Sequence, residues 1–112
     1  MGLDFKHIKG DTFEAVNFSI TVNSVSIDLT NYVIKMQLRK QACDVIKSLS
    51  LTSVGNAGIT ITNGVGGLFK INKQIINIDP FNYVYDIELV SSLGVVKTYI
   101  SGFFNISPDI TR

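Results

Sequence analysis

The sequence is short of the residues on which most enzymatic and metal chemistry depends. Its 112 residues include one histidine, one cysteine and no tryptophan. A single cysteine cannot form an intramolecular disulfide bond, and these counts exclude metal sites built from thiolates or from several histidines. The lack of tryptophan also weakens a carbohydrate-binding interpretation, because sugar sites commonly rely on exposed aromatic platforms. We therefore expect neither a metal nor a cofactor.

Charge is scarce as well. Charged residues make up 17% of the chain and the formal net charge is +1, whereas soluble domains average about 25% charged residues. Nucleic-acid binding needs clustered lysine and arginine, so we expect none here. The densest basic stretch, residues 35–40, alternates like one strand with a polar face. Low charge fits a surface covered by neighbouring chains, and equally an ordinary β-domain with Ser, Thr and Asn on its solvated faces.

Long apolar runs are also missing. No stretch approaches the ~18 residues of a membrane span, and residues 1–6 contain no apolar segment of signal-peptide length. Lys6 stands where a myristoylation motif needs Ser or Thr. We expect a soluble protein that is made in the cytoplasm and has no membrane contact.

What the chain does have is nearly continuous alternation of apolar and polar residues, which is typical of half-buried strands. The clearest alternating segments are residues 16–22, 34–39, 59–62 and 83–89. Residues 45–49 are expected to form a shorter strand, and residues 95–106 a long last strand with a bulge or kink at Gly102. Residues 73–79 are expected to form one short helical turn.

Turn signals separate these segments. Asn23-Ser24, residues 63–67 and residues 91–94 are expected to be hairpin turns. The glycines of residues 63–67 do not indicate a phosphate-binding loop, because neither a helical pattern nor a Lys-Ser/Thr pair follows them.

Short strands at intervals of about ten residues, without crossover helices, predict a single all-β domain over residues 1–112. The expected architecture is an immunoglobulin-like antiparallel β-sandwich of about seven to nine strands. Tyr83, near the start of the penultimate strand, is a candidate tyrosine corner, in which a Tyr hydroxyl bonds to upstream backbone. A plain core aromatic explains Tyr83 equally well.

No residue is assigned a catalytic role. His7 lies near the N-terminus, and no Gly-x-Ser-x-Gly elbow presents a nucleophile. Asp86 and Glu88 share one strand face at about 7 Å, a spacing that suits a glycosidase pair. Acids on the outward face of a sandwich are usually partners of Lys or Arg across the sheet, which is the interpretation we prefer. Cys43 has no basic helix terminus to activate it and is expected to be a small buried residue.

Several segments are informative together through their order and spacing. They are residues 9–13 (KGDTF), 27–32 (IDLTNY), 34–40 (IKMQLRK), 58–61 (GITI), 83–89 (YVYDIEL), 96–98 (VKT) and 102–106 (GFFNI). In this order they resemble small immunoglobulin-like β-domains of tailed-phage virions. The nearest type is the N-terminal domain of baseplate upper proteins and of related tail- or head-fibre attachment proteins.

The resemblance implies a non-enzymatic domain that anchors one virion component to another within an oligomeric assembly. Such domains often continue into a coiled coil or a receptor-binding domain, whereas this sequence ends at Arg112. That difference favours an assembly or adaptor role in tail, baseplate or head fibre. The expected partners are other virion proteins and further copies of the chain, in a virion assembled after synthesis in the host cytoplasm. A module that binds a host-surface glycan or protein is the alternative.

Edge strands of a sandwich carry unpaired backbone groups that invite pairing with another chain. The last strand is long, lightly charged and rich in Phe, Tyr and Ile. Its expected interface residues are Val96, Thr98, Ile100, Phe104 and Ile106. The alternative is that the chain itself covers both faces of this strand.

Overall fold

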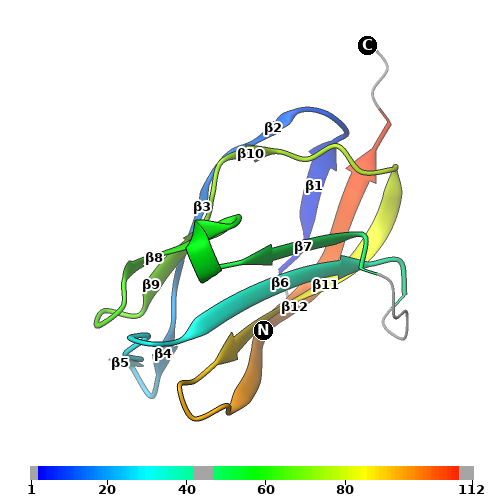
Figure 1. Cartoon of the computed structure of the whole chain (residues 1–112). Helices are drawn as coiled ribbons and strands as arrows, with labels where there is room; N and C mark the ends of the chain where they lie inside the picture. Colours follow the sequence, from blue (N-terminus) through cyan, green and yellow to red (C-terminus); the bar gives the residue numbers. More distant parts are fainter. Residues whose placement is uncertain (1–2, 42–46, 109–112) are drawn as a thin grey trace.

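The structure is a computed structural model that describes residues 3–41 and 47–108 (Figure 1). In these ranges the chain forms twelve β-strands and one 3-10 turn, η1 (Val54–Asn56). The all-β prediction is confirmed. The arrangement, however, is one curled mixed sheet with three smaller sheets and is not a clear immunoglobulin sandwich of two facing sheets.

The large sheet has five strands, and three of its four pairings are antiparallel. The exception is the first strand, which runs parallel to the last one, so the sheet is mixed. In spatial order the strands are β1 (Phe5–Ile8), β12 (Val96–Ser107), β11 (Phe81–Val90), β6 (Val33–Arg39) and β7 (Leu49–Thr52).

The smaller sheets come from the segments between these strands. The largest of them is antiparallel and has the order β3 (Val16–Ser19), β9 (Leu68–Ile71) and β8 (Ile59–Asn63). Two further pairs are two residues long in each strand: β2 (Thr12–Phe13) with β10 (Gln74–Ile75), and β4 (Thr21–Val22) with β5 (Val25–Ser26).

The hydrophobic core joins the large sheet to the smaller ones. Its fully buried side chains come from β6, β11 and β12 on one side and from β8 and β9 on the other, among them Ile34, Ile87, Phe104, Ile59 and Phe69. Aromatic rings pack between the sheets, with the ring centroids of Phe13 on β2 and Phe104 on β12 5.5 Å apart. Burying this many side chains from distant segments gives the short strands the stability that they lack alone.

Alternation in β6 and β11 is as the sequence indicates. Ile34, Met36 and Leu38 are buried, while the residues between them point to the opposite face. In β11 the buried set is Tyr83, Tyr85, Ile87 and Leu89. Because successive side chains of a strand point to opposite faces, Asp86 and Glu88 lie on the outer face of the large sheet, away from the core.

Two predicted elements differ from the structure. The helical turn expected for residues 73–79 is wrong: Gln74 and Ile75 are extended and pair with Phe13 and Thr12 of β2. Backbone pairing with a distant segment therefore decides the conformation of this stretch. The shorter strand expected at residues 45–49 begins only at Leu49 as β7, and its first two residues, like Cys43, lie outside the described residues.

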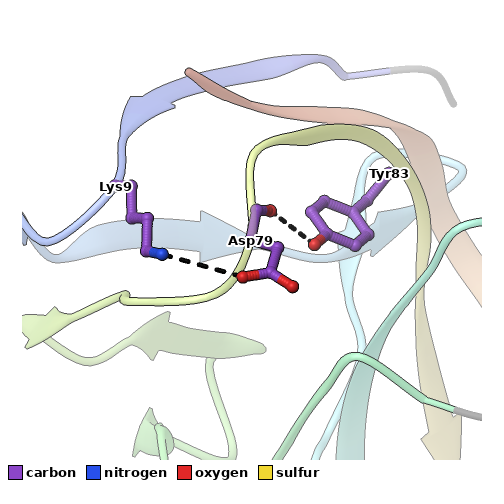
Figure 2. A network of polar contacts seen from close by, with 3 residues as sticks. All are labelled: Lys9, Asp79 and Tyr83. Carbon is purple, nitrogen blue, oxygen red and sulfur yellow. Dashed lines mark hydrogen bonds and ion pairs between the residues drawn. The ribbon is translucent and has the colours of Figure 1, made fainter. Parts of the chain in front are cut away.

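Tyr83 forms the hydrogen bond expected of a tyrosine corner. Its hydroxyl donates to the carbonyl oxygen of Asp79, four residues upstream, at 2.5 Å (Figure 2). The carboxylate of the same aspartate lies 3.7 Å from the Lys9 ammonium, so Asp79 links the segment after β1 to the start of β11. Burial raises the pKa of Tyr83 above its ordinary value, and the nearby Asp79 carboxylate adds to the rise.

The segment before β1 is fastened to the large sheet by three hydrogen bonds. The Leu3 amide donates to the Ser101 carbonyl at 3.0 Å, and the Phe103 amide donates to the Asp4 carboxylate at 3.0 Å. The third bond runs from the Tyr85 hydroxyl to the Leu3 carbonyl. Burial, with a contribution from the Asp4 carboxylate, raises the pKa of Tyr85 to about 12.

Gly102 makes this attachment possible. A Cβ atom at this position would lie 2.4 Å from the Leu3 carbonyl oxygen and 2.7 Å from an Asp4 carboxylate oxygen. Gly102 itself pairs in regular register with Tyr85, so the bulge or kink predicted at this glycine is not there. The glycine is needed because another backbone segment approaches closely.

Candidate functional site

The five expected interface residues do not share one surface. Ile100, Phe104 and Ile106 are buried in the chain's own core, at 4%, 1% and 2% exposure, so they offer no free surface. Val96 and Thr98 are exposed. The chain itself therefore covers the second half of this strand, from Ile100 onward on its inner face, which was the alternative stated for it.

A bulge at Tyr99 causes this division. Ile87 pairs with Ile100 and the next residue, Glu88, pairs with Thr98, which leaves Tyr99 as an extra residue on β12. One extra residue reverses which face the alternating side chains occupy. Val96 and Thr98 consequently lie on the outer face. In a regular strand, residues two and four positions before the buried Ile100 would lie on the same face as Ile100.

Three hairpin tips lie at the same end of the molecule (Figure 1), and six of the exposed aliphatic residues belong to them. The first tip joins β4 to β5 through Asn23 and Ser24, whose φ angles of 53° and 64° belong to the left-handed conformation of a two-residue hairpin turn. Its flanking residues, Val22 and Val25, are 47% and 67% exposed. The turn therefore holds both valines outward.

The second tip joins β8 to β9 and packs against the first. The Gly66 amide donates to the Asn63 side-chain oxygen at 3.0 Å, and Gly67 has a positive φ of 72°. A Cβ atom on Gly67 would lie 2.7 Å from the Ile20 carbonyl oxygen, so the turn lies directly against the segment that leads into β4. Val65, at the top of this turn, is 71% exposed.

The third tip joins β11 to β12 at residues 91–95. The Val95 amide donates to the Ser91 hydroxyl oxygen at 3.1 Å, and Gly94 closes the turn with a φ of 83°. Leu93 is 90% exposed, and the neighbouring Val95 and Val96 are about half exposed. We call the six exposed side chains of the three tips the aliphatic end: Val22, Val25, Val65, Leu93, Val95 and Val96.

The aliphatic end carries no charge. Residues 21–26, 63–67 and 91–96 contain no Asp, Glu, Lys or Arg. An exposed hydrophobic residue by itself is normal, but a contiguous apolar patch on a soluble domain usually marks a contact surface. This end of the molecule is therefore a candidate protein-contact site.

A second candidate lies on the outer face of the large sheet. A hollow of about 470 Å³ is formed there by β6, β11 and β12, and its polar side chains are Gln37, Arg39, Asp86, Glu88, Thr98 and Ser101. Phe103 and Val84 supply apolar surface, and Phe103 is 49% exposed. The bulge at Tyr99 lies at this part of the sheet, and bulges bend and twist the strand that carries them.

Within the described residues, the two carboxylates of the hollow have no side-chain partner. Glu88 lies opposite Lys35 in register, but among the described residues neither Glu88 nor Asp86 forms an ion pair or a side-chain hydrogen bond. Arg39 donates from Nη2 to Gln37 at 2.9 Å, while its Nε is buried and has no partner. The cross-strand ion pairs expected for these acids are absent from the described part of the chain.

His7, another candidate raised by the sequence, is held by contacts of its own. His7 is half-buried on β1, where its ring packs edge-on against Phe13 and its Nε2 lies 2.9 Å from the Asp11 carbonyl oxygen. Over residues 3–41 and 47–108, no group of three or more His, Cys, Asp or Glu side chains is placed to hold a metal ion. In the same ranges the structure contains no helix with the length and apolarity that crossing a membrane requires.

No protein-family model matches the sequence, and a search of curated proteins finds no significant match. The resemblance to phage virion domains therefore stays a prediction.

Sequence reasoning overlooked the aliphatic end, although a signal for it was present. Val25, Val65 and Leu93 each stand in a turn segment otherwise made of Asn, Ser and Gly. An apolar residue in such a turn has no neighbouring strand to cover it, so it is expected to be exposed. Attention to apolar residues within turns, instead of within the last strand, would have located this surface.

Proposed function

We propose that this chain is a non-catalytic structural domain of a phage virion that associates with further copies of itself through the aliphatic end. The observation that carries the proposal is the set of exposed aliphatic side chains on three uncharged hairpin tips at the same end of the molecule. Association that covers such a surface is favourable, by about 25 cal/mol for each Å² of apolar area removed from water. The virion setting is supported by the ordered segment resemblance and by the low overall charge.

A second copy is the partner that the charge distribution favours. Two identical uncharged surfaces can meet without burying an unpaired charge, which is the main electrostatic penalty at an interface. Symmetric contacts between identical patches are also the commonest form of oligomer. Docking of the aliphatic end onto a different virion protein is the competing outcome.

An immunoglobulin-like relationship is part of this proposal. The bond from Tyr83 to the Asp79 carbonyl supports it, since the same kind of bond occurs at the corner of immunoglobulin-like domains. The parallel pairing of β1 with β12 departs from the antiparallel pattern that the sequence indicated.

Light scattering over a range of protein concentrations tests the self-association. We expect the native chain to form a defined oligomer, and we expect Val25→Asp or Leu93→Asp to leave it monomeric, because a buried unpaired carboxylate at the interface is costly. Val54→Asp is the matched control: Val54 is 61% exposed but lies on η1, outside the aliphatic end.

Two results contradict the proposal. One is a native chain that stays monomeric at every concentration. The other is an oligomer that persists in both tip variants, whether or not the Val54→Asp control also keeps it.

A further inference from the structure

We propose that the hollow on the outer face of the large sheet is a binding site for a neutral saccharide. This site is separate from the aliphatic end, and the inference does not depend on the self-association proposed above. Its volume, about 470 Å³, lies within the range of roughly 300–1,000 Å³ that is typical of small-molecule sites.

The strand register arranges the lining as a small grid. On β11, Asp86 has Gln37 of β6 on one side and Ser101 of β12 on the other. In the neighbouring outward row, Val84 lies between Arg39 and Phe103. Adjacent strands are about 4.8 Å apart, so a ligand lying across the three strands meets a polar row and an aromatic surface together.

The charged groups that line the hollow are of both hydrogen-bonding kinds. The carboxylates of Asp86 and Glu88 can only accept, whereas the guanidinium of Arg39 can only donate. A ligand that offers acceptors and donors side by side would satisfy these groups at the same time.

This mixture narrows the class of ligand. A phosphate or other anion would be repelled by the two carboxylates, and a cation would face the Arg39 guanidinium without a third acidic ligand. A wholly apolar ligand would leave the polar groups desolvated and unpaired. Sugar hydroxyls both donate and accept, and the apolar face of a sugar ring can pack on the half-exposed ring of Phe103.

The test uses the full chain on an array of neutral hexose, deoxyhexose and N-acetylhexosamine oligosaccharides, with sialylated and phosphorylated oligosaccharides as separate arms. Titration calorimetry then measures the affinity for the neutral oligosaccharide that binds best. We expect saturable binding in the neutral arm and recovery of the sugar intact. Asp86→Asn and Phe103→Ala should each weaken the binding about tenfold or more, equivalent to about 1.4 kcal/mol.

Phe81→Ala is the matched control, because Phe81 is 41% exposed on β11, one of the three strands that form the hollow, but does not line it. Its affinity should equal that of the native chain. Binding to no neutral saccharide, binding only in the sialylated or phosphorylated arms, or binding that survives both hollow variants would each overturn the inference. Cleavage of the sugar would overturn it as well, because Asp86 and Glu88 would then be acting as a hydrolytic pair.

Discussion

Replacing Gly102 by alanine should detach the segment before β1 from the large sheet. The new Cβ would lie 2.4 Å from the Leu3 carbonyl oxygen and 3.0 Å from the Leu3 carbonyl carbon. Both are backbone atoms, so they cannot move aside by a change of rotamer, and the whole segment has to shift.

The magnitude follows from the hydrogen bonds that hold this segment. They are the bonds from the Leu3 amide to Ser101, from the Phe103 amide to Asp4, and from the Tyr85 hydroxyl to Leu3. At about 0.5–1.5 kcal/mol for each bond, losing all three lowers the free energy of unfolding by roughly 1.5–4.5 kcal/mol. This is a large share of the 5–15 kcal/mol that is typical of a whole domain.

Urea unfolding of four proteins measures the effect: the native chain, Gly102→Ala, a chain lacking residues 1–4, and the chain with both changes. In the chain without Leu3 and Asp4, no atom remains for the alanine Cβ to clash with. The substitution should then leave the free energy of unfolding unchanged or raise it by about 0.5–1 kcal/mol, since glycine weakens strand interiors. Two results refute the reasoning: a loss below about 0.5 kcal/mol in the full chain, or an equal loss in the shortened chain.

Two further predictions concern the buried tyrosines. Tyr83→Phe removes the bond to the Asp79 carbonyl and should lower the free energy of unfolding by about 1–2 kcal/mol in urea unfolding, whereas Tyr99→Phe, which loses no hydrogen bond within the described residues, should change it little. Stability should also fall as the pH rises above 10, because unfolded tyrosine loses its proton near pH 10 while folded Tyr85 keeps it until about pH 12. Urea unfolding from about pH 8 to about pH 11 measures this fall; Tyr85→Phe should flatten it, and an equally steep fall in that variant would contradict the assignment.

Local pattern was sufficient to predict the two central strands and the hairpin turns. In β6 and β11 a strict alternation places Met36 and Ile87 in the core and Gln37 and Asp86 outside, as expected for strands with one covered face. The turn at Asn23-Ser24 was also predictable, because Asn tolerates the left-handed conformation that the turn requires.

The features that the sequence did not predict depend on contacts between distant segments. Gly102 indicated a bulge, but its role is to admit Leu3, which is almost the whole chain away in sequence. The actual bulge is at Tyr99, where no glycine or proline marks it, and it reverses the facing of Val96 and Thr98. Two of the five expected interface residues on β12 are therefore exposed, and the other three are buried.

The candidate sites were predictable to different degrees. The outward position of Asp86 and Glu88 followed from alternation alone. The burial of the Arg39 Nε on the same face was not predictable in this way, because alternation gives the side on which a side chain lies and not which of its atoms are covered. The gathering of three hairpin tips at one end depends on the topology that joins them.

Carbene footprinting of the purified chain at low and high concentration tests the proposed contact surface most directly. We predict that on association Val25, Val65 and Leu93 become protected from labelling together, while Val54 and Ile75, which are 61% and 68% exposed, remain labelled. An oligomer in which the three tips stay fully labelled, with protection instead along the edge strands β1 or β7, would contradict association through the aliphatic end.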